Sequence, residues 1–482
     1  MNRRSFLTAA PFAMAGAVDS IAQKNANSPA GRHVSEPART AHPNILWILG
    51  DQLRAQALSG NGDPNARTPN LDRAMVNGVT FGNHVAGFPL CCPFRGSMLT
   101  GRYPHHCVPG HEYPLPAGQQ TVADVFNENG YRTAYFGKWH LGGFHENEGR
   151  AAFFITDPAR RGGFQTWTGY QDNDSQWDSW VHGGAGARAF HYRLPGFETD
   201  EIAKLTISYL TDRAAERKAN PSAVKPFFAV MSVQPPHNPY VAPERFMATY
   251  NPERLQLRPN VAHVAKLEHQ VRRDLAGYYA MLENLDWNYG RIIETLEQNG
   301  LLDNTYVFFF ADHGDMHGSH GLSGKICPYE ESIRTPFIIS GGYSAYQPWL
   351  SGRLPVVSNH VDIAPTSLGL CGIRKPAWME GTDLSHHRLH ERAAGPEPDS
   401  AYLQCVVPFL GHPPYRGIVT RDGWKYVCFE NQSWLQFNLN EDPYEEMNLA
   451  HSYLYSVERR KLIGRLKQWV NDTDDRFPIP DA

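Results

Sequence analysis

The sequence lacks several features that mark whole classes of protein. Acidic and basic residues almost balance over its 482 positions, 49 against 45, so the net charge of −4 carries none of the positive surplus of a nucleic-acid-binding protein. Its seven cysteines are odd in number, and their spacing predicts neither a zinc site nor a disulfide framework. No internal repeat is evident. These absences leave a globular protein with enough chain for one large core and a smaller domain, and with no nucleic-acid partner.

An apolar stretch lies close to the N-terminus, directly after the pair Arg3-Arg4. Residues 7–18 are too few and too rich in alanine to span a membrane, and the small residues of Ser20-Ile21-Ala22 form a cleavage site behind them. This pattern predicts twin-arginine export to a periplasmic or secreted location, without a stable membrane anchor. The expected segments are a twin-arginine signal peptide over residues 1–22 and a polar linker over residues 23–42.

Two apolar runs end in acidic residues. Residues 44–49 form a continuous apolar run typical of a strand buried on both faces of a parallel sheet, and residues 305–310 repeat this pattern. If both strands are central and parallel, the carboxylates that follow them meet at one edge, where they repel each other unless a cation lies between them. The alternative is that the second group only caps a turn. The expected ligands of one divalent cation are Asp51, Gln52, Asp312 and His313.

The remaining patterns predict an α/β fold, with a mixed, mainly parallel central sheet flanked by helices and a smaller C-terminal α+β subdomain that carries an antiparallel sheet. We expect the main domain over residues 43–385 and the C-terminal subdomain over residues 400–482. Residues 142–194 show neither helical nor strand periodicity and are interpreted as a long loop, either functional or disordered. Its tryptophans form either an apolar platform for a ligand or packing beneath the loop; they are Trp167, Trp177 and Trp180.

The most specific motif runs from Pro89 to Arg102, where Cys-x-Pro-x-Arg is followed by Leu-Thr-Gly-Arg. Pro93 suits the first turn of a short helix that begins at Cys91, and Arg95 and Arg102 would bring guanidinium groups to a helix N-terminus that already favours anions. The arrangement predicts a nucleophile that faces an oxyanion. The alternative is a buried cysteine pair beside a turn.

This run resembles the signature of the type I sulfatases, the formylglycine-dependent branch of the alkaline-phosphatase-like superfamily, although the family commonly has serine where Phe94 stands. Further matches to the family pattern extend over nearly all of residues 43–470. Gln52 departs from it, because the family usually has aspartate there. The resemblance implies that Cys91 is oxidised to formylglycine by a formylglycine-generating or sulfatase-maturing enzyme.

The resemblance also implies hydrolysis of a sulfate ester on a small molecule or glycan. One hydroxyl of the hydrated aldehyde would attack sulfur and displace the alcohol, and the second would then lose its proton and expel sulfate. Calcium is the favoured cation, with the formylglycine oxygen at Cys91 completing its ligand shell. In this reading Lys138, Lys325 and Arg95 offset the sulfate charge, while His237 or His140 protonates the leaving group. The implied catalytic residues are Cys91, Arg95, Lys138, His140, His237 and Lys325.

Two other functions fit the same residues. A phosphonate monoester or phosphodiester hydrolase uses the same nucleophile on a similar scaffold. A catalytically silent glycan-binding protein would keep Cys91 unoxidised. The sequence leaves the sulfate ester itself open among aryl sulfates, sulfated polysaccharides and small alkyl sulfates.

Overall fold

The computed structural model describes residues 42–221, 224–342, 350–389, 395 and 397–481. The predicted signal peptide and almost all of the predicted linker therefore lie outside the described residues. Within them, no helix combines the length and the apolar character that crossing a membrane requires.

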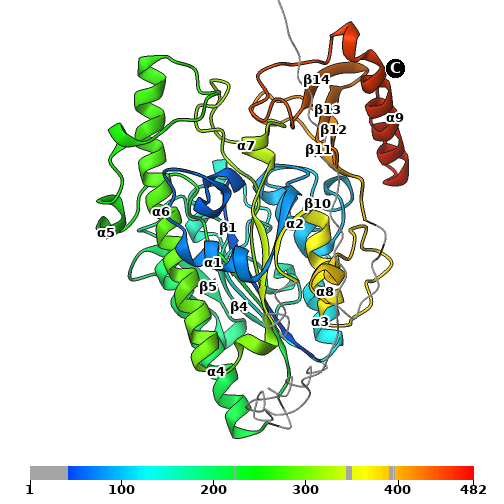
Figure 1. Ribbon diagram of the computed structural model, residues 1–482. Coiled ribbons are helices and arrows are strands. Elements are labelled where there is room, and N and C mark those ends of the chain that lie inside the picture. The colour runs from blue at the N-terminus through cyan, green and yellow to red at the C-terminus, as the bar shows by residue number, and fades with distance from the viewer. Residues whose placement is uncertain (1–41, 222–223, 343–349, 390–394, 396, 482) are drawn as a thin grey trace, which may run out of the picture. The chain divides into compact units, whose positions relative to one another are not determined.

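A ten-stranded sheet forms the centre of the protein, in the order β10-β2-β9-β8-β1-β7-β3-β4-β5-β6 (Figure 1). The first predicted strand, β1, lies between β7 and β8 and is parallel to both, with Gly50 opposite Ala311. The two apolar runs are central and parallel, which is the condition set in the sequence analysis, and they pair directly with each other. The strands are β1 (Asn44–Gly50), β2 (Val79–Val85), β3 (Arg132–Lys138), β4 (Thr166–Tyr170), β5 (Trp180–Gly183), β6 (Phe190–Arg193), β7 (Phe227–Ser232), β8 (Thr305–Ala311), β9 (Phe337–Gly341) and β10 (Gly352–Asn359).

The sheet is mixed but mainly parallel. Strand β9 runs antiparallel to β2 and β8, and β5 runs antiparallel to β4 and β6. The expectation that residues 142–194 lack strand structure is wrong, because β4, β5 and β6 extend the sheet beyond β3. These strands have only four or five residues, with glycine among them, so their pairing with a neighbour defines them better than their own pattern does.

Helices cover both faces of the sheet, and alternate side chains of β1 divide between two cores. Leu46 and Ile48 pack with side chains of α1, α4 and α6, whereas Ile45, Trp47 and Leu49 pack with α2, α3 and α8 on the other face. The helices are α1 (Pro69–Asn77), α2 (Cys91–Thr100), α3 (Val122–Glu128), α4 (Glu198–Ala219), α5 (Glu244–Met247), α6 (Ala265–Gln298), α7 (Glu330–Ile333), α8 (Ile363–Leu370) and α9 (Ser456–Asp472).

The C-terminal region forms a second sheet of four antiparallel strands, with α9 beside it (Figure 1). Apolar side chains of this sheet share a core with Val85, Leu90 and Ile333 of the large domain. The predicted α+β subdomain with an antiparallel sheet is confirmed, and its boundary between residues 385 and 400 stays a prediction. The strands are β11 (Ser400–Cys405), β12 (Tyr415–Thr420), β13 (Trp424–Phe429) and β14 (Gln432–Asn438).

Candidate active site at the carboxyl edge of the sheet

Cys91 is the first residue of helix α2. The preceding Leu90 is extended, and its carbonyl accepts a hydrogen bond of 3.0 Å from the backbone N–H of Phe94. The helix ends at Gly101, whose φ of 63° lies in the left-handed region that glycine tolerates. All ten helical residues are buried. The predicted short helix is confirmed, and it places Cys91 where free backbone N–H groups favour an anion.

Arg102 does not reach this end of the helix, contrary to the sequence-based expectation. A ten-residue helix is about 15 Å long, and Arg102 follows its C-terminus. There it donates to Oε1 of Gln119 at 3.3 Å and lies 4.0 Å from Glu380. Arg95 is the guanidinium that lies near Cys91, because it is one turn further along the same helix.

Four side chains from separate stretches of chain meet beyond β1 and β8. Single ligand atoms of Asp51, Cys91, Asp312 and His313 all lie within 4.8 Å of one another, and all four residues are buried. The Cys91 Sγ atom is 3.1 Å from Nε2 of His313 and 3.7 Å from Oδ1 of Asp51. The expected convergence of the two strand ends with the cysteine motif is therefore present in the structure.

Arg95 orients both carboxylates. Its Nη2 atom donates to Oδ2 of Asp51 at 3.1 Å and to Oδ2 of Asp312 at 3.2 Å. The two Oδ1 atoms each lie 3.6 Å from Nε2 of His313 instead. Two carboxylate oxygens and one imidazole nitrogen thus face a common point beside Cys91, which is a donor set that fits a divalent cation.

His313 presents an unprotonated nitrogen to this point. Its Nδ1 atom lies 3.0 Å from the carbonyl oxygen of Gly314, and because a carbonyl only accepts, Nδ1 carries the proton. Burial lowers the pKa of His313 to about 4, against the opposing effect of Asp312. The imidazole is consequently neutral, as a metal ligand must be.

Gln52 lies at the edge of the group of four. Its backbone adopts a φ of 65°, its N–H donates to Oδ1 of Asp312 at 3.0 Å, and its side-chain amide donates to Asp315. Its Oε1 atom accepts from Nζ of Lys325 at 3.0 Å, and the same Nζ is 3.1 Å from Cys91 Sγ. Lys325 therefore links Gln52 to the cysteine. Sequence reasoning missed Asp315, which holds the amide of Gln52.

Lys138 is fully buried between two carboxylates. Its Nζ atom is 2.8 Å from Oδ2 of Asp51 and 3.0 Å from Oδ2 of Asp172. Burial alone would lower the pKa of Lys138, but Asp172 and Asp51 raise it well above its usual value. Asp172 was missed because its loop shows no periodicity, and pairing of Lys138 with Tyr170 is what brings it here. Its position could have identified it, because Asp172 follows the end of a strand, as Asp51 does.

The two predicted proton donors occupy different positions. His140 is buried with a φ of 54°, and its Nδ1 lies 3.6 Å from Oδ2 of Asp172. His237 is half-buried, and its Nδ1 donates to the carbonyl of Asn238 at 2.8 Å. Burial, followed by the charge of Lys325, lowers the pKa of His237 to about 3. Their roles in proton transfer stay predictions.

Several aromatic side chains near the site take part in packing around it. His317 stacks edge-on against Tyr278 at 4.4 Å between ring centroids, and His320 stacks on Tyr329 at 4.2 Å. Trp167 is buried, which favours packing beneath the loop over a ligand platform, whereas Trp177 is 47 % exposed.

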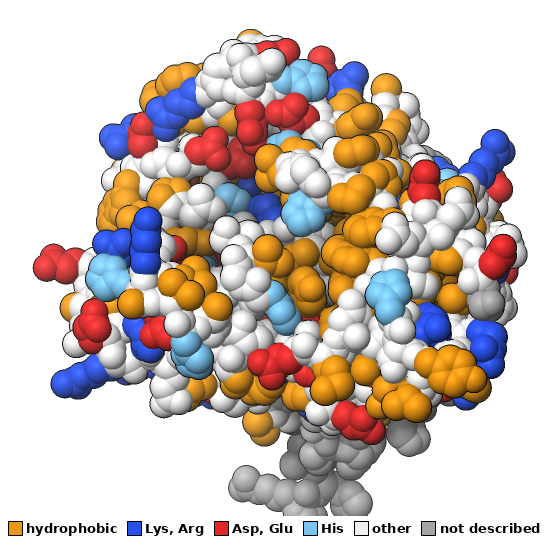
Figure 2. Space-filling view, turned by 90° about the horizontal axis from the view of Figure 1, so that it is seen from above, with side chains coloured by type: hydrophobic (Ala, Val, Ile, Leu, Met, Phe, Trp, Pro, Cys, Tyr) orange, Lys and Arg blue, Asp and Glu red, His pale blue; other side chains and the backbone are white. Residues whose placement is uncertain are grey.

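The carboxyl edge of the central strands faces the viewer in Figure 2. The surface is hollowed there, with basic and histidine side chains inside the hollow and a group of acidic side chains beside it (Figure 2). A ligand that carries negative charge can therefore approach this edge from solvent.

Comparisons of the sequence and of the structure with known proteins indicate the same family. Residues 43–373 match the family described as Sulfatase, and residues 318–472 match the C-terminal region of N-sulphoglucosamine sulphohydrolase. The ulvan-active sulfatase of Formosa agariphila is 33% identical over 466 residues, which span 93% of this chain and 85% of that protein. The arylsulfatase of Clostridium perfringens is 30% identical over 482 residues, spanning 88% and 95%.

A solved structure from Bacteroides thetaiotaomicron, described under the metabolism of multiple glycosaminoglycans, has a TM-score of 0.78 at 26% identity and covers 90% of this chain and 97% of that one. The family matches and the relatives extend over both sheets and over the segments that supply the site. The chain therefore belongs to the sulfatase family and is a sulfuric ester hydrolase.

Proposed function

We propose that the protein hydrolyses its sulfate ester with a formylglycine formed from Cys91 and with one divalent cation, for which Ca²⁺ is favoured. The observation that carries this proposal is the convergence of Cys91 with Asp51, Asp312 and His313 from distant parts of the chain. A formylglycine-generating or sulfatase-maturing enzyme would act on Cys91 first. When present, the two groups would supply the attacking oxygen and the positive charge that lowers its pKa and offsets the sulfate charge.

The cation would be held by the Oδ1 oxygens of Asp51 and Asp312 and by Nε2 of His313. The other two predicted ligands, Gln52 and the formylglycine oxygen at Cys91, stay part of the proposal. Arg95 supports the two carboxylate ligands by fixing their Oδ2 oxygens. The Nη1 atom of Arg95 also forms hydrogen bonds within the protein: it donates to the backbone carbonyl of Lys138 at 2.9 Å and to Ser232 Oγ at 2.8 Å. We assign Arg95 to positioning the ligands.

Lys325 and Lys138 provide positive charge at the site, Lys325 beside Cys91 and Lys138 beside Asp51. Lys325 approaches the cysteine directly and can donate to a sulfate oxygen bound there, which stabilises the charge that develops during transfer. Lys138 is held by its two carboxylates and keeps Asp51 ionised: burial would favour the neutral acid, but Lys138 and neighbouring cations hold the pKa of Asp51 well below its usual value. Of the two histidines, half-buried His237 is nearer to solvent, and the negative charge of a bound sulfate would raise its lowered pKa, so that it could protonate a leaving alcohol that extends toward solvent.

We propose that the ester is carried by a saccharide. The relative named for ulvan and the structure described under glycosaminoglycan metabolism support this class. Export by the twin-arginine route would bring the enzyme to such a substrate. Cell fractionation of an Arg3→Lys, Arg4→Lys double variant tests the route, and unchanged export would contradict it.

Two measurements test the reaction. The tryptic peptide that contains Cys91 should be lighter than the unmodified peptide, because conversion of the thiol to an aldehyde removes one sulfur and two hydrogen atoms and adds one oxygen atom. Cys91→Ala should abolish hydrolysis of an aryl sulfate and leave thermal unfolding nearly unchanged. Turnover that persists in Cys91→Ala would overturn the nucleophile assignment. A matched aryl phosphonate ester that reacts faster than the aryl sulfate would favour the phosphonate hydrolase alternative.

A further inference from the structure

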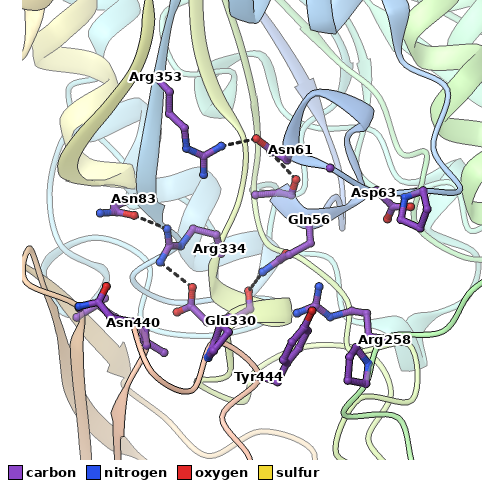
Figure 3. A pocket seen from close by; sticks show the side chains of 18 of the residues that line it. Gln56, Asn61, Asp63, Asn83, Arg258, Glu330, Arg334, Arg353, Asn440 and Tyr444 are labelled. Carbon is purple, nitrogen blue, oxygen red and sulfur yellow. Dashed lines mark hydrogen bonds and ion pairs between the residues drawn. The ribbon is translucent and has the colours of Figure 1, made fainter. Parts of the chain in front are cut away.

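A cavity of about 670 Å³, a volume within the usual range of ligand pockets, has none of the residues of the candidate active site in its described lining (Figure 3). Its walls come from the segment after β1, from residues 256–259, and from the C-terminal turns 419–423 and 439–444. The pocket therefore requires the C-terminal subdomain, which contributes none of the residues assigned to the reaction.

Residues 330–334 separate this pocket from the catalytic residues. On the pocket side, the N–H of Ala55 donates to the carbonyl of Arg334 at 2.8 Å, and Nε2 of Gln56 donates to the carbonyl of Glu330 at 3.2 Å. On the other side, Gly314, which follows the His313 ligand, donates to the carbonyl of Ser332 at 2.8 Å. The two sites lie on opposite sides of one segment of chain.

The described lining carries four arginines against two carboxylates. Both carboxylates are already bound: Asp63 accepts from the hydroxyl of Tyr279 at 2.7 Å, and Glu330 lies between Arg334 at 2.7 Å and Lys425 at 2.8 Å. Three of the four arginines also have carboxylate partners: Arg334 pairs with Glu330, Arg258 with Glu331 at 2.8 Å, and Arg421 with Glu397 at 2.9 Å. The unbalanced positive charge of the lining is therefore that of Arg353.

Arg353 carries this unbalanced charge. Its guanidinium donates to Oδ1 of Asn61 at 2.5 Å and to the carbonyl of Gly82 at 3.5 Å, which are both uncharged oxygens. Within the described part of the chain, it forms no ion pair with a carboxylate. Burial and the neighbouring Arg334 lower the pKa of Arg353, as expected for a cation without a counter-charge.

The remaining lining is suited to hydroxyl groups. Side-chain amides surround the arginines, and each offers both donors and an acceptor. In Figure 3, Gln56, Asn61, Asn83 and Asn440 lie around the cavity from both of its walls. Tyr444 adds a ring, stacked beneath the guanidinium of Arg258 at 5.0 Å. The described lining contains no cysteine, histidine or lysine, so the pocket offers binding groups and no evident nucleophile.

We propose that this pocket binds a sulfated segment of an oligosaccharide without cleaving it. Arginine forks match sulfate oxygens as they match carboxylates and phosphates, and the amides match sugar hydroxyls. The class of ligand rests on the proposed function, in which the substrate is a saccharide. The location of the binding site rests on the pocket alone. It gives the C-terminal subdomain a function in holding the polymer.

Binding by the full-length chain to a short dextran sulfate, measured by calorimetry, tests the proposal. Arg353→Gln and Arg421→Gln remove one charge from opposite walls, and each should weaken binding by roughly tenfold through loss of a charge-assisted hydrogen bond. Arg460→Gln, at an exposed position of helix α9, makes the same charge change elsewhere and should leave binding unchanged. Unsulfated dextran of equal length and inorganic sulfate alone should bind much more weakly than dextran sulfate.

Hydrogen exchange gives the position of the ligand. Dextran sulfate should protect peptides that cover residues 256–259 and 419–423 in the wild type, and should protect them less in Arg353→Gln at the same ligand concentration. Equal affinity of all three variants, or protection confined to residues 137–140, would overturn the pocket assignment. Hydrolysis of an aryl sulfate should be unchanged in all three variants. If the wild type hydrolysed no sulfate ester, the proposed function would be wrong. The binding measurements would still show whether the pocket binds a sulfated saccharide.

Discussion

At the scale of single residues, the site is a chain of alternating charges. Asp172, Lys138 and Asp51 follow one another at 3.0 and 2.8 Å, and Arg95 continues the series at 3.1 Å. Each buried charge has a partner of opposite sign, which is the condition for keeping such groups ionised away from water. Asp172 is not part of the group of four around Cys91, so its effect passes through the two side chains that it contacts, Lys138 at 3.0 Å and His140 at 3.6 Å.

We predict that Asp172→Asn lowers kcat on an aryl sulfate by about 10- to 100-fold and changes KM less. The amide still fills the space but no longer balances the charge of Lys138, which then shifts toward Asp51. Steady-state kinetics measure this, and Asp172→Glu should recover part of kcat. Asp178→Asn is the matched control, because that carboxylate lies in the same loop and pairs with surface arginines. A change in kcat and KM no larger than that of the control would contradict the positioning role.

At the scale of elements, helix α2 holds Cys91 in place by close packing. Gly96 lies in the middle of this helix, and a Cβ atom there would lie 2.4 Å from Cγ2 of Val108 and 2.7 Å from its Cβ. Real Cβ atoms do not approach other atoms so closely, so either the helix or the Val108 segment would have to move. Glycine at this position is therefore a packing requirement of the helix that carries the nucleophile.

We predict that Gly96→Ala lowers the free energy of unfolding by about 1–3 kcal/mol, although alanine is the better helix former. Guanidinium denaturation measures the change, and activity should fall with it because α2 is displaced. Gly464→Ala is the control: Gly464 lies in helix α9, and beyond the backbone of that helix no atom lies within 4 Å of the place that a Cβ would take. This variant should be neutral or slightly stabilised. Equal effects of both substitutions would contradict the packing argument.

The elements differ in how far the sequence could predict them. Strands β1 and β8 were predictable because continuous apolar runs report burial on both faces, and their acidic ends then followed from parallel pairing. Strands β4 to β6 were not, because glycine and polar residues interrupt them and only their neighbours make them strands. Asp172 was not predicted as a site residue because it follows β4, which the sequence did not predict. The partners of Gln52 and Arg102 were also unpredictable, since the direction of a side chain depends on packing between distant segments.

At the scale of the whole molecule, one buried histidine links two strands of the large sheet, and a second contacts the segment that pairs with the C-terminal sheet. Nδ1 of His84, on β2, lies 2.8 Å from Oγ of Ser358 on β10. Nδ1 of His360 accepts from the N–H of Gly87 at 2.9 Å, and the carbonyl of Gly87 accepts from Gln404 of β11 at 2.6 Å. Burial lowers the pKa of His360 to about 3 and holds that of His84 well below 6.5.

This arrangement makes folding stability sensitive to acid. A histidine whose folded-state pKa is depressed stabilises the protein fully above its unfolded pKa of 6.5, and this contribution is lost as the pH falls below that value. Each pH unit below 6.5 should cost about 1.4 kcal/mol per histidine. Denaturation midpoints at pH 7.5 and 5.5 measure the loss. In His360→Asn the loss should be smaller by about 1.4 kcal/mol, because asparagine accepts from Gly87 without titrating. His263→Asn, at a side chain that is 92% exposed, is the control and should keep the wild-type loss. If His360→Asn lost as much stability as the control, the acid sensitivity would have to arise elsewhere, because a neutral acceptor at this junction has no proton to gain.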